Sequence, residues 1–240
     1  MKMRRFIDSH LKPKSDSELE SMLRISDELG YSAVAAFYVN MNIQNLKKLC
    51  DEIGIDLVSR IDIKPNSESE LASSLSHNRR RFELVSVECA SKAVARKAAR
   101  DHRVDLISFS PSLQERSKVW FDRQSAALTR ESGCAYEINA ANLFSMGSAS
   151  TAKLLAIIRK EVVNAVRYDV NVVLSSGAGT RFQLRDPLSL ASLTNLFGMN
   201  EEEGLDTISE NPWKIVEENR NKLAPEFIEP GVRLVKKHAC

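Results

Sequence analysis

The chain has 240 residues, of which 43% are hydrophobic, and its 34 basic and 32 acidic residues leave a formal net charge of +2. This length can bury a substantial core, and we expect a single domain over residues 1–240. The near-neutral balance excludes nucleic-acid binding driven by net charge alone, and no window of about 18 apolar residues predicts a membrane span. We therefore expect a cytoplasmic protein without a membrane partner.

Short apolar segments rich in Val and Ile alternate with amphipathic segments, which predicts strands that alternate with helices. Most of these strands are apolar on both faces, as expected for a parallel sheet covered by helices. Seven strands in one domain, with no G-x-G-x-x-G after the first, favour a TIM-like (β/α) barrel of the α/β class. The predicted strands are Phe6–Ile7, Ser32–Tyr38, Ile55–Ile63, Glu83–Cys89, Val104–Phe109, Ala135–Asn139 and Asn171–Ser175.

Capping residues mark the ends of the helices between these strands. Ser15 and Ser67 are each followed three residues later by Glu, which is the capping-box pattern of a helix start. Gly30, Gly54 and Gly133 each precede an apolar strand and suit the left-handed conformation just past a helix end. The repeated order of helix, glycine and strand supports the barrel.

The eighth strand of the barrel is irregular or missing, and either Arg181–Arg185 or Val232–Val235 could supply it. After the seventh strand the pattern becomes helical, and residues 224–240 are expected to form an extended tail. Extra C-terminal helices are predicted at Leu188–Phe197, after Asn200, and at Trp213–Leu223.

Barrels place their functional groups at the carboxyl-terminal ends of the strands, and three such ends carry a recognisable pattern. Residues 6–12 are Phe-Ile-Asp-Ser-His-Leu-Lys, residues 137–139 are Glu-Ile-Asn, and residues 173–179 are Val-Leu-Ser-Ser-Gly-Ala-Gly. Together they resemble the PHP (polymerase and histidinol phosphatase) barrels, whose members are metal-dependent phosphoesterases. The resemblance implies a PHP-like domain.

Several residues depart from that superfamily's metal-binding motifs. Asp8 and His10 match the start of its Asp-x-His-x-His, but Lys12 stands in place of the second His. A phosphoesterase site needs several imidazole and carboxylate ligands, and an ammonium among them would repel the metal. We therefore expect no metal on this chain, with His10 as a hydrogen-bonded residue at the end of its strand. The eroded metal-site positions are Asp8, His10, Lys12, Glu137, Gly177 and Gly179.

The same departures, with other motifs between Phe6 and about Leu223, resemble the archaeal ribonuclease P protein component 3 family. The resemblance implies an RNA-binding protein subunit, with no catalytic residue or cofactor of its own. Ribonuclease P RNA, with Mg²⁺, would remove the 5′ leader of precursor tRNA by endonucleolytic cleavage. A small ferredoxin-like protein subunit would pair with this chain, and two such heterodimers would form a heterotetramer. The motifs are Arg60, Val104-Asp105-Leu-Ile-Ser, Phe121-Asp122-Arg123, Glu137-Ile, Ser175-Ser-Gly-Ala and Leu184-Arg185-x-Pro187.

A stripe of basic residues lies on the helix predicted at Ser91–His102. Lys92, Arg96 and Arg100 recur at four-residue spacing. Like charges at this spacing repel by a few tenths of a kcal/mol per pair, a cost that a phosphate backbone would offset. The stripe is therefore either an RNA contact or a solvated helix face.

Other basic residues are also candidates for RNA contact, each with an alternative. Arg181 and Arg185 could grip a phosphate from the loop Ser175–Arg185, which could equally be a glycine turn that closes the barrel. Arg60 and Arg123 could contact RNA or form ion pairs inside the barrel rim. Residues 201–229 contain 3 basic and 9 acidic residues, so this acidic helical region is a candidate protein-binding face.

Two other functions remain open at this stage. A metal-dependent phosphoesterase would use Asp8, His10 and Glu137. A Schiff-base aldolase would use Lys64, which follows the third predicted strand.

Overall fold

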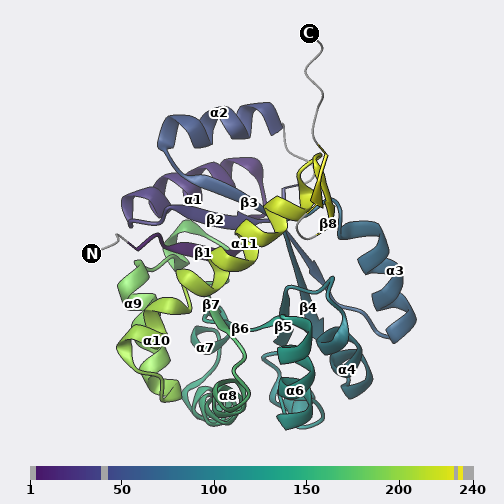
Figure 1. The fold of residues 1–240 in the computed structure, drawn as a ribbon. Coiled ribbons are helices and arrows are strands. Elements are labelled where there is room, and N and C mark those ends of the chain that lie inside the picture. Colours follow the sequence, from purple (N-terminus) through teal and green to yellow (C-terminus); the bar gives the residue numbers. More distant parts are fainter. Residues whose placement is uncertain (1–3, 39–42, 230–231, 235–240) are drawn as a thin grey trace.

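The computed structural model describes residues 4–38, 43–229 and 232–234. Seven parallel strands form one sheet, in which each strand pairs with the next in chain order. Helices follow the strands and surround them, so the predicted α/β barrel is confirmed (Figure 1). The strands are β1 (Ile7–Leu11), β2 (Ala33–Ala36), β3 (Asp56–Ile63), β4 (Leu84–Cys89), β5 (Leu106–Phe109), β6 (Ala135–Asn139) and β7 (Val172–Ser175).

Most helix boundaries lie where the capping residues predict them. Ser15 and Ser67 accept hydrogen bonds from the backbone three residues ahead, at the starts of α1 and α3. Gly30, Gly54 and Gly133 all have positive φ angles. The helices are α1 (Asp16–Glu28), α2 (Ile43–Ile53), α3 (Glu68–Asn78), α4 (Lys92–Arg100), α5 (Leu113–Arg116), α6 (Arg123–Ser132), α7 (Ala141–Phe144), α8 (Ser148–Arg167), η1 (Arg181–Gln183), α9 (Pro187–Ser192), η2 (Leu193–Phe197), α10 (Glu201–Asp206) and α11 (Glu210–Leu223).

The first strand is longer than the sequence pattern predicts. The expected strand covers Phe6–Ile7, whereas β1 covers Ile7–Leu11 and every one of its residues is buried. The apolar run stops at Asp8, but the strand continues through buried polar side chains, because Asp8 accepts a hydrogen bond from the Ser176 N–H and His10 lies against Asp62. Asp8 and His10 therefore lie inside the strand.

The gap between β7 and β1 is bridged at its carboxyl-terminal end by the loop after β7. Leu11 pairs with Ala178 in an isolated parallel bridge, and the N–H of Lys12 donates to the Ala178 carbonyl at 2.8 Å. The suggestion that Arg181–Arg185 forms the eighth strand is wrong, because residues 181–183 form the 3₁₀ turn η1.

At the amino-terminal end, the same gap is filled by the connection between α10 and α11. The Ile7 N–H donates to the Ile208 carbonyl at 2.9 Å, and the Leu174 N–H donates to the Thr207 carbonyl at 3.1 Å. Residues 207–208 thus satisfy the backbone groups that a missing eighth strand would leave open.

The chain beyond α11 forms a separate antiparallel pair of strands, β8 (Phe227–Glu229) and β9 (Val232–Arg233). The suggestion that Val232–Val235 closes the barrel is therefore wrong for its described part. The predicted extended tail, residues 224–240, includes residues 230–231 and 235–240, which lie outside the described residues. Within the described ranges, no helix has the length and apolar content needed to cross a membrane.

Helix α11 lies across the amino-terminal end of the barrel and closes it (Figure 1). Trp213 and Val216 pack against the inward-facing side chains of the first four strands, including Ile7 and Leu84. Arg220, near the end of α11, binds the carboxylates of Asp56 and Glu83. The interior of the barrel is therefore open to solvent only at the opposite, carboxyl-terminal end.

Truncating the apolar plug should destabilise the barrel. Trp213 is 7% exposed, so Trp213→Ala removes buried apolar area and is expected to lower the free energy of unfolding by about 3–5 kcal/mol. Urea denaturation followed by circular dichroism measures the change. Phe182→Ala is the control, since Phe182 is 78% exposed and should cost little. Equal effects of the two substitutions would contradict the role of α11 as a plug.

Candidate functional site

The barrel interior changes from apolar to polar above the α11 plug. The next inward-facing layer contains the small side chains Ser9, Ser86 and Ser175 together with the larger Arg60 and Glu137, and all five residues are buried. Serine at three of these positions leaves the volume that a guanidinium and a carboxylate need at the centre. The sequence therefore builds a charged pair into the middle of the barrel.

Arg60, from β3, uses all five of its N–H groups inside the protein. Its Nη1 and Nη2 atoms each donate to one oxygen of Glu137, both at 2.7 Å. Nη1 also donates to the Ser9 carbonyl at 2.6 Å, while Nε and Nη2 donate to Oδ1 of Asp62 at 3.0 and 2.6 Å. The side chain is 1% exposed. Arg60 therefore forms the ion pair that the sequence allows as the alternative to an RNA contact, and in this structure none of its N–H groups is left for RNA.

Glu137, from β6, is the fully buried counter-ion of Arg60. It also accepts hydrogen bonds from the hydroxyls of Ser86 at 3.1 Å and Ser175 at 3.0 Å. Burial raises the pKa of Glu137, but the adjacent Arg60 guanidinium outweighs burial and holds this pKa below its usual range. Glu137 is thus an ionised carboxylate held by four hydrogen bonds.

Asp62 is a member of this cluster that sequence reasoning missed. Its side chain is 45% exposed at the rim of the barrel. Burial raises its pKa, but Arg60 and His10 together hold that pKa well below its usual range. The spacing Arg60-x-Asp62 is a signal that could have found it, because residues two apart on a strand point to the same side.

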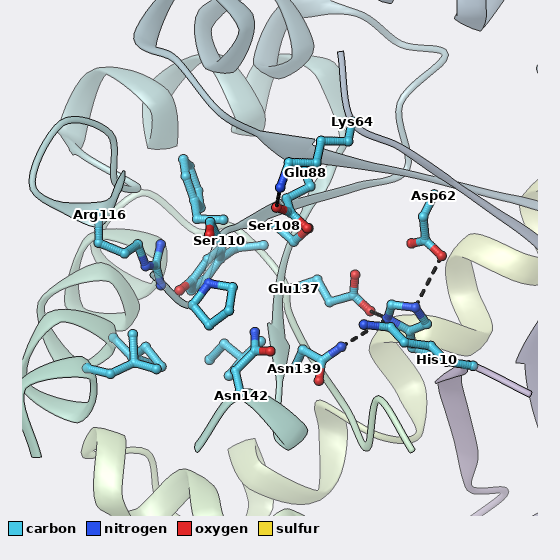
Figure 2. A pocket seen from close by; sticks show the side chains of 17 residues that line it. His10, Asp62, Lys64, Glu88, Ser108, Ser110, Arg116, Glu137, Asn139 and Asn142 are labelled. Atoms are coloured by element: carbon cyan, nitrogen blue, oxygen red, sulfur yellow. Dashed lines mark hydrogen bonds and ion pairs between the residues drawn. The ribbon is translucent and has the colours of Figure 1, made fainter. Parts of the chain in front are cut away.

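His10 lies beside this cluster, with its side chain 7% exposed (Figure 2). Asn139 accepts a hydrogen bond from the Ala141 N–H through Oδ1, so its Nδ2 faces His10 Nδ1 at 3.1 Å. Nδ1 is therefore the acceptor, and the ring proton lies on Nε2. Nε2 is 3.1 Å from Oδ2 of Asp62 but lacks the alignment of a hydrogen bond.

Asp8 and Gly177 lie next to His10 and its partner Asn139, respectively. Asp8 accepts a hydrogen bond from the Ser176 N–H at 3.0 Å, and burial raises the pKa of its carboxyl group. Gly177 has a φ of +62°, and a Cβ atom there would overlap the side-chain amide of Asn139. Glycine at position 177 is therefore required by the backbone and by the packing of Asn139.

A pocket of about 490 Å³ opens above this cluster, at the carboxyl-terminal end of the barrel (Figure 2). We call it the mouth pocket. Its charged and amide side chains include His10, Lys12, Asp62, Lys64, Glu88, Arg116, Glu137, Asn139 and Asn142.

The cations at the mouth pocket are largely compensated by carboxylates. Lys64 binds Glu88 at 2.7 Å, and this hydrogen bond raises the pKa of Lys64. A Schiff-base lysine needs a lowered pKa, so the geometry argues against the aldolase. Lys12 is exposed and forms no ion pair with a described residue.

A second buried ion pair lies beside the mouth pocket. Arg116 donates to both oxygens of Glu161 at 2.9 Å, and the two side chains are 4% and 1% exposed. Glu161, from α8, also accepts from the Tyr136 hydroxyl at 2.6 Å and the Phe121 N–H at 2.9 Å. This pair holds α5 and α8 against the barrel.

The residues of the barrel centre do not fit a metal centre. Among the described residues, no three His, Cys, Asp or Glu side chains are grouped as metal ligands. The two carboxylates nearest His10 are both turned to the Arg60 guanidinium. A divalent ion would have to displace a fully bonded cation from this position.

The basic stripe on α4 is only partly free. Arg96 binds the Asp122 carboxylate at 2.5 Å, and Lys92 lies over the Trp120 ring, 5.0 Å from its centroid. Arg100, together with Arg123 at the start of α6, is exposed and has no hydrogen bond or ion pair with any described residue. The opposite face of α4 packs against the barrel, where Val94, Ala95, Ala98 and Ala99 are all buried.

The loop after β7 closes the barrel, which is the second of the two roles that the sequence allows for it. The Gly179 N–H donates to Oε1 of Gln183 at 2.7 Å. Arg181 donates to the Ser21 hydroxyl at 3.2 Å, and Arg185 donates to the Leu184 carbonyl at 2.7 Å. Both guanidiniums are exposed, so a phosphate contact in addition to these bonds stays a prediction.

The acidic C-terminal helices form ion pairs with the first two described residues. Arg4 binds Asp206, at the end of α10, and Arg5 binds Glu217 of α11. Part of the acidic surface is thus neutralised within the protein.

Comparison with known proteins identifies what the chain resembles. The model of a family described as RNase P subunit p30 matches residues 5–224. Ribonuclease P protein component 3 of Methanosarcina acetivorans is 27% identical over 228 residues, which cover 95% of this chain and 93% of that protein.

Two solved structures share the fold. A chain in the cryo-EM structure of archaeal ribonuclease P with mature tRNA aligns with a TM-score of 0.82 and 20% identity, covering 97% of this chain and 99% of that chain. The histidinol phosphate phosphatase of Lactococcus lactis, in a complex with zinc, L-histidinol and phosphate, aligns with a TM-score of 0.51 and 13% identity. That alignment covers 81% of this chain and 93% of the phosphatase.

Gly177 gives a direct test of the packing around His10. Gly177→Ala should destabilise the protein more than Gly30→Ala, because both positions have positive φ but only position 177 also lacks space for a Cβ. We expect a loss of about 1 kcal/mol for Gly30→Ala and at least about 1 kcal/mol more for Gly177→Ala. Chemical denaturation measures both. Equal losses would show that Asn139 does not restrict this position.

Glu137→Gln tests the charge of the central ion pair. At pH 7 the substitution leaves a buried guanidinium without its buried counter-ion, with only the half-exposed Asp62 remaining, and should cost about 3 kcal/mol. Because folding lowers the pKa of Glu137, its stabilisation is complete above the ordinary value of 4.5 and is lost as the pH falls through the lowered folded value.

The difference in unfolding free energy between wild type and Glu137→Gln should therefore shrink as denaturation is repeated from pH 7 down to pH 3. Glu20→Gln is the control, because Glu20 is half-exposed in a helical ion pair. A difference that does not depend on pH would count against an ionised Glu137.

Proposed function

Because the chain belongs to the RNase P subunit p30 family, we propose that it is an RNA-binding protein subunit of ribonuclease P without an active site of its own. The observation that carries this proposal is the family match, which spans the whole barrel from residue 5 to residue 224. The barrel centre supports the second part, because Arg60 occupies the position where the carboxylates converge. No observation favours the phosphoesterase over this function.

In the proposed function, ribonuclease P RNA performs the chemistry. The RNA, with Mg²⁺, would cleave the 5′ leader from precursor tRNA, and the protein would meet precursor tRNA only within the assembled enzyme. Neither a cofactor nor a catalytic residue is assigned to the chain. We place its activity in the cytoplasm.

The surface that best suits the RNA is formed by α4 and α6, which pack side by side (Figure 1). Arg100 and Arg123 are exposed there and have no carboxylate partner among the described residues. Phosphate contacts of this kind position a protein on RNA and make its binding sensitive to salt. Arg96 is withdrawn from this surface by Asp122, so we assign it to positioning α6.

A small ferredoxin-like subunit is the proposed protein partner, in heterodimers that pair into a heterotetramer. The exposed part of the acidic C-terminal helices is the surface we assign to it. Glu201 and Glu210 are exposed on α10 and α11, respectively, and are not bound to Arg4 or Arg5. Basic side chains of a partner would complement them.

Reconstituted ribonuclease P tests the proposal. Omitting this chain from the RNA and the other protein subunits should lower the rate of precursor-tRNA cleavage. The double substitution Arg100→Ala and Arg123→Ala should weaken RNA binding at physiological salt. Because two phosphate contacts are lost, the slope of log affinity against log salt should become less steep by about 2, as measured by filter binding.

A matched control comes from α2, across the barrel from α4 and α6 (Figure 1). Lys47 and Lys48 are exposed, and replacing both with Ala removes the same charge. This variant should keep the wild-type salt slope. Full cleavage without the chain would overturn the proposed function, whereas an unchanged slope in the arginine variant would overturn only the surface.

A further inference from the structure

Two phenylalanine rings are exposed beside the barrel mouth, one of them in the loop that follows β7. Phe182 lies in η1 and is 78% exposed, and Phe144 ends α7 and is 58% exposed. Burying an aromatic ring is favourable, so rings that are left in water beside a loop are candidates for contact with a ligand.

Two arginine side chains join these rings into one surface. The Arg185 guanidinium lies over the Phe144 ring, 5.7 Å from its centroid, and its Nη1 donates to the Phe182 carbonyl at 3.2 Å. The Arg181 guanidinium lies over the Phe182 ring, 4.8 Å from its centroid. Rings and guanidiniums thus alternate, and we call these four residues the aromatic rim. The exposed fractions of the rings show that ring surface stays accessible beside each guanidinium.

A pocket of about 340 Å³ lies next to Phe144 and Arg185. We call it the rim pocket. Lys14 is its second cation, and neither cation forms an ion pair with a described carboxylate. None of the described residues that line the rim pocket is acidic, in contrast to the mouth pocket. Cations beside small hydroxyl and glycine residues suit a phosphate group. Such residues here are Ser176, Gly177, Gly179 and Thr180.

We propose that the aromatic rim and the rim pocket bind unpaired nucleotides of RNA. Bases stack on Phe144 and Phe182, and a phosphate between them is held by Lys14 and Arg185. Stacking on an aromatic ring needs a base that has left its own stack, and paired RNA does not offer such a base. The inference rests on the proposed function of the chain as an RNA-binding subunit, and the paired RNA backbone stays assigned to α4 and α6.

A protein segment is the other ligand that exposed rings could bind. The charges favour RNA, because the aromatic rim and the rim pocket together carry three cations and no carboxylate among the described residues. Guanidinium planes also stack with bases, so both kinds of side chain in the aromatic rim suit the same ligand.

The double substitution Phe144→Ala and Phe182→Ala is the test, made in the full chain. The probe is a single-stranded oligouridylate that carries one 2-aminopurine, a base whose fluorescence is quenched when it stacks. The variant should lose the quenching and bind the probe about tenfold or more weakly than wild type. Its slope of log affinity against log salt should stay at the wild-type value, because no charge is removed.

Two control variants separate stacking from a general loss of apolar surface. Phe144→Trp with Phe182→Trp keeps an aromatic ring at both positions and should retain the quenching. Val163→Ala with Leu196→Ala truncates side chains that are 58% and 54% exposed on α8 and η2, and should bind the probe like wild type. All variants should bind an RNA hairpin of equal charge with wild-type affinity.

The proposal is overturned if wild type does not quench the probe, or if the double alanine variant quenches it fully. Equal losses of affinity for the probe and the hairpin would also contradict it. If the alanine variant keeps the quenching but loses a protein subunit from reconstituted ribonuclease P, the rings bind protein instead. Quenching is measured without cleavage, so full cleavage in the absence of this chain would overturn the proposed function but leave a stacking result standing.

Discussion

The barrel depends on the ion pair between Arg60 and Glu137, because two charges at its centre must be satisfied or the fold fails. Each is desolvated, and the attraction between them compensates only when every remaining donor and acceptor is also bonded. The structure meets this condition through the Ser9 carbonyl and the hydroxyls of Ser86 and Ser175, three residues whose side chains are small enough to leave space for the pair. The pair thus dictates the composition of the layer around it.

This pair also divides the barrel along its axis. Below it, Trp213 and Val216 of α11 complete an apolar plug at the amino-terminal end. Above it, Asp62 and His10 reach the mouth pocket, where water can enter. Since β3 and β6 are not neighbours in the sheet, the ion pair ties together opposite walls that backbone hydrogen bonds do not join. Closure at residues 207–208 completes the enclosure at the plug end.

The sequence predicts the seven strands and most helix ends because periodicity and capping are local signals. Such local signals do not predict which charged residues pair with one another. Arg96 fits a stripe at helical spacing, yet it binds Asp122, 26 residues away. Arg60 likewise meets Glu137 only because the barrel brings β3 opposite β6. Closure by residues 207–208 leaves no pattern either, because it consists of two backbone hydrogen bonds from a connection between helices.

The mouth pocket and the outer helices α4 and α6 differ in whether their basic side chains are already paired with carboxylates. This difference indicates which of the two surfaces suits RNA better. At the mouth, Lys64 is paired with Glu88, and Arg116 with Glu161, so a phosphate there would compete with carboxylates already in place. It would also approach Asp62, whose low pKa keeps it negative. Arg100 and Arg123 have no such competitor among the described residues. A phosphate backbone would therefore bind more favourably outside the barrel, over α4 and α6.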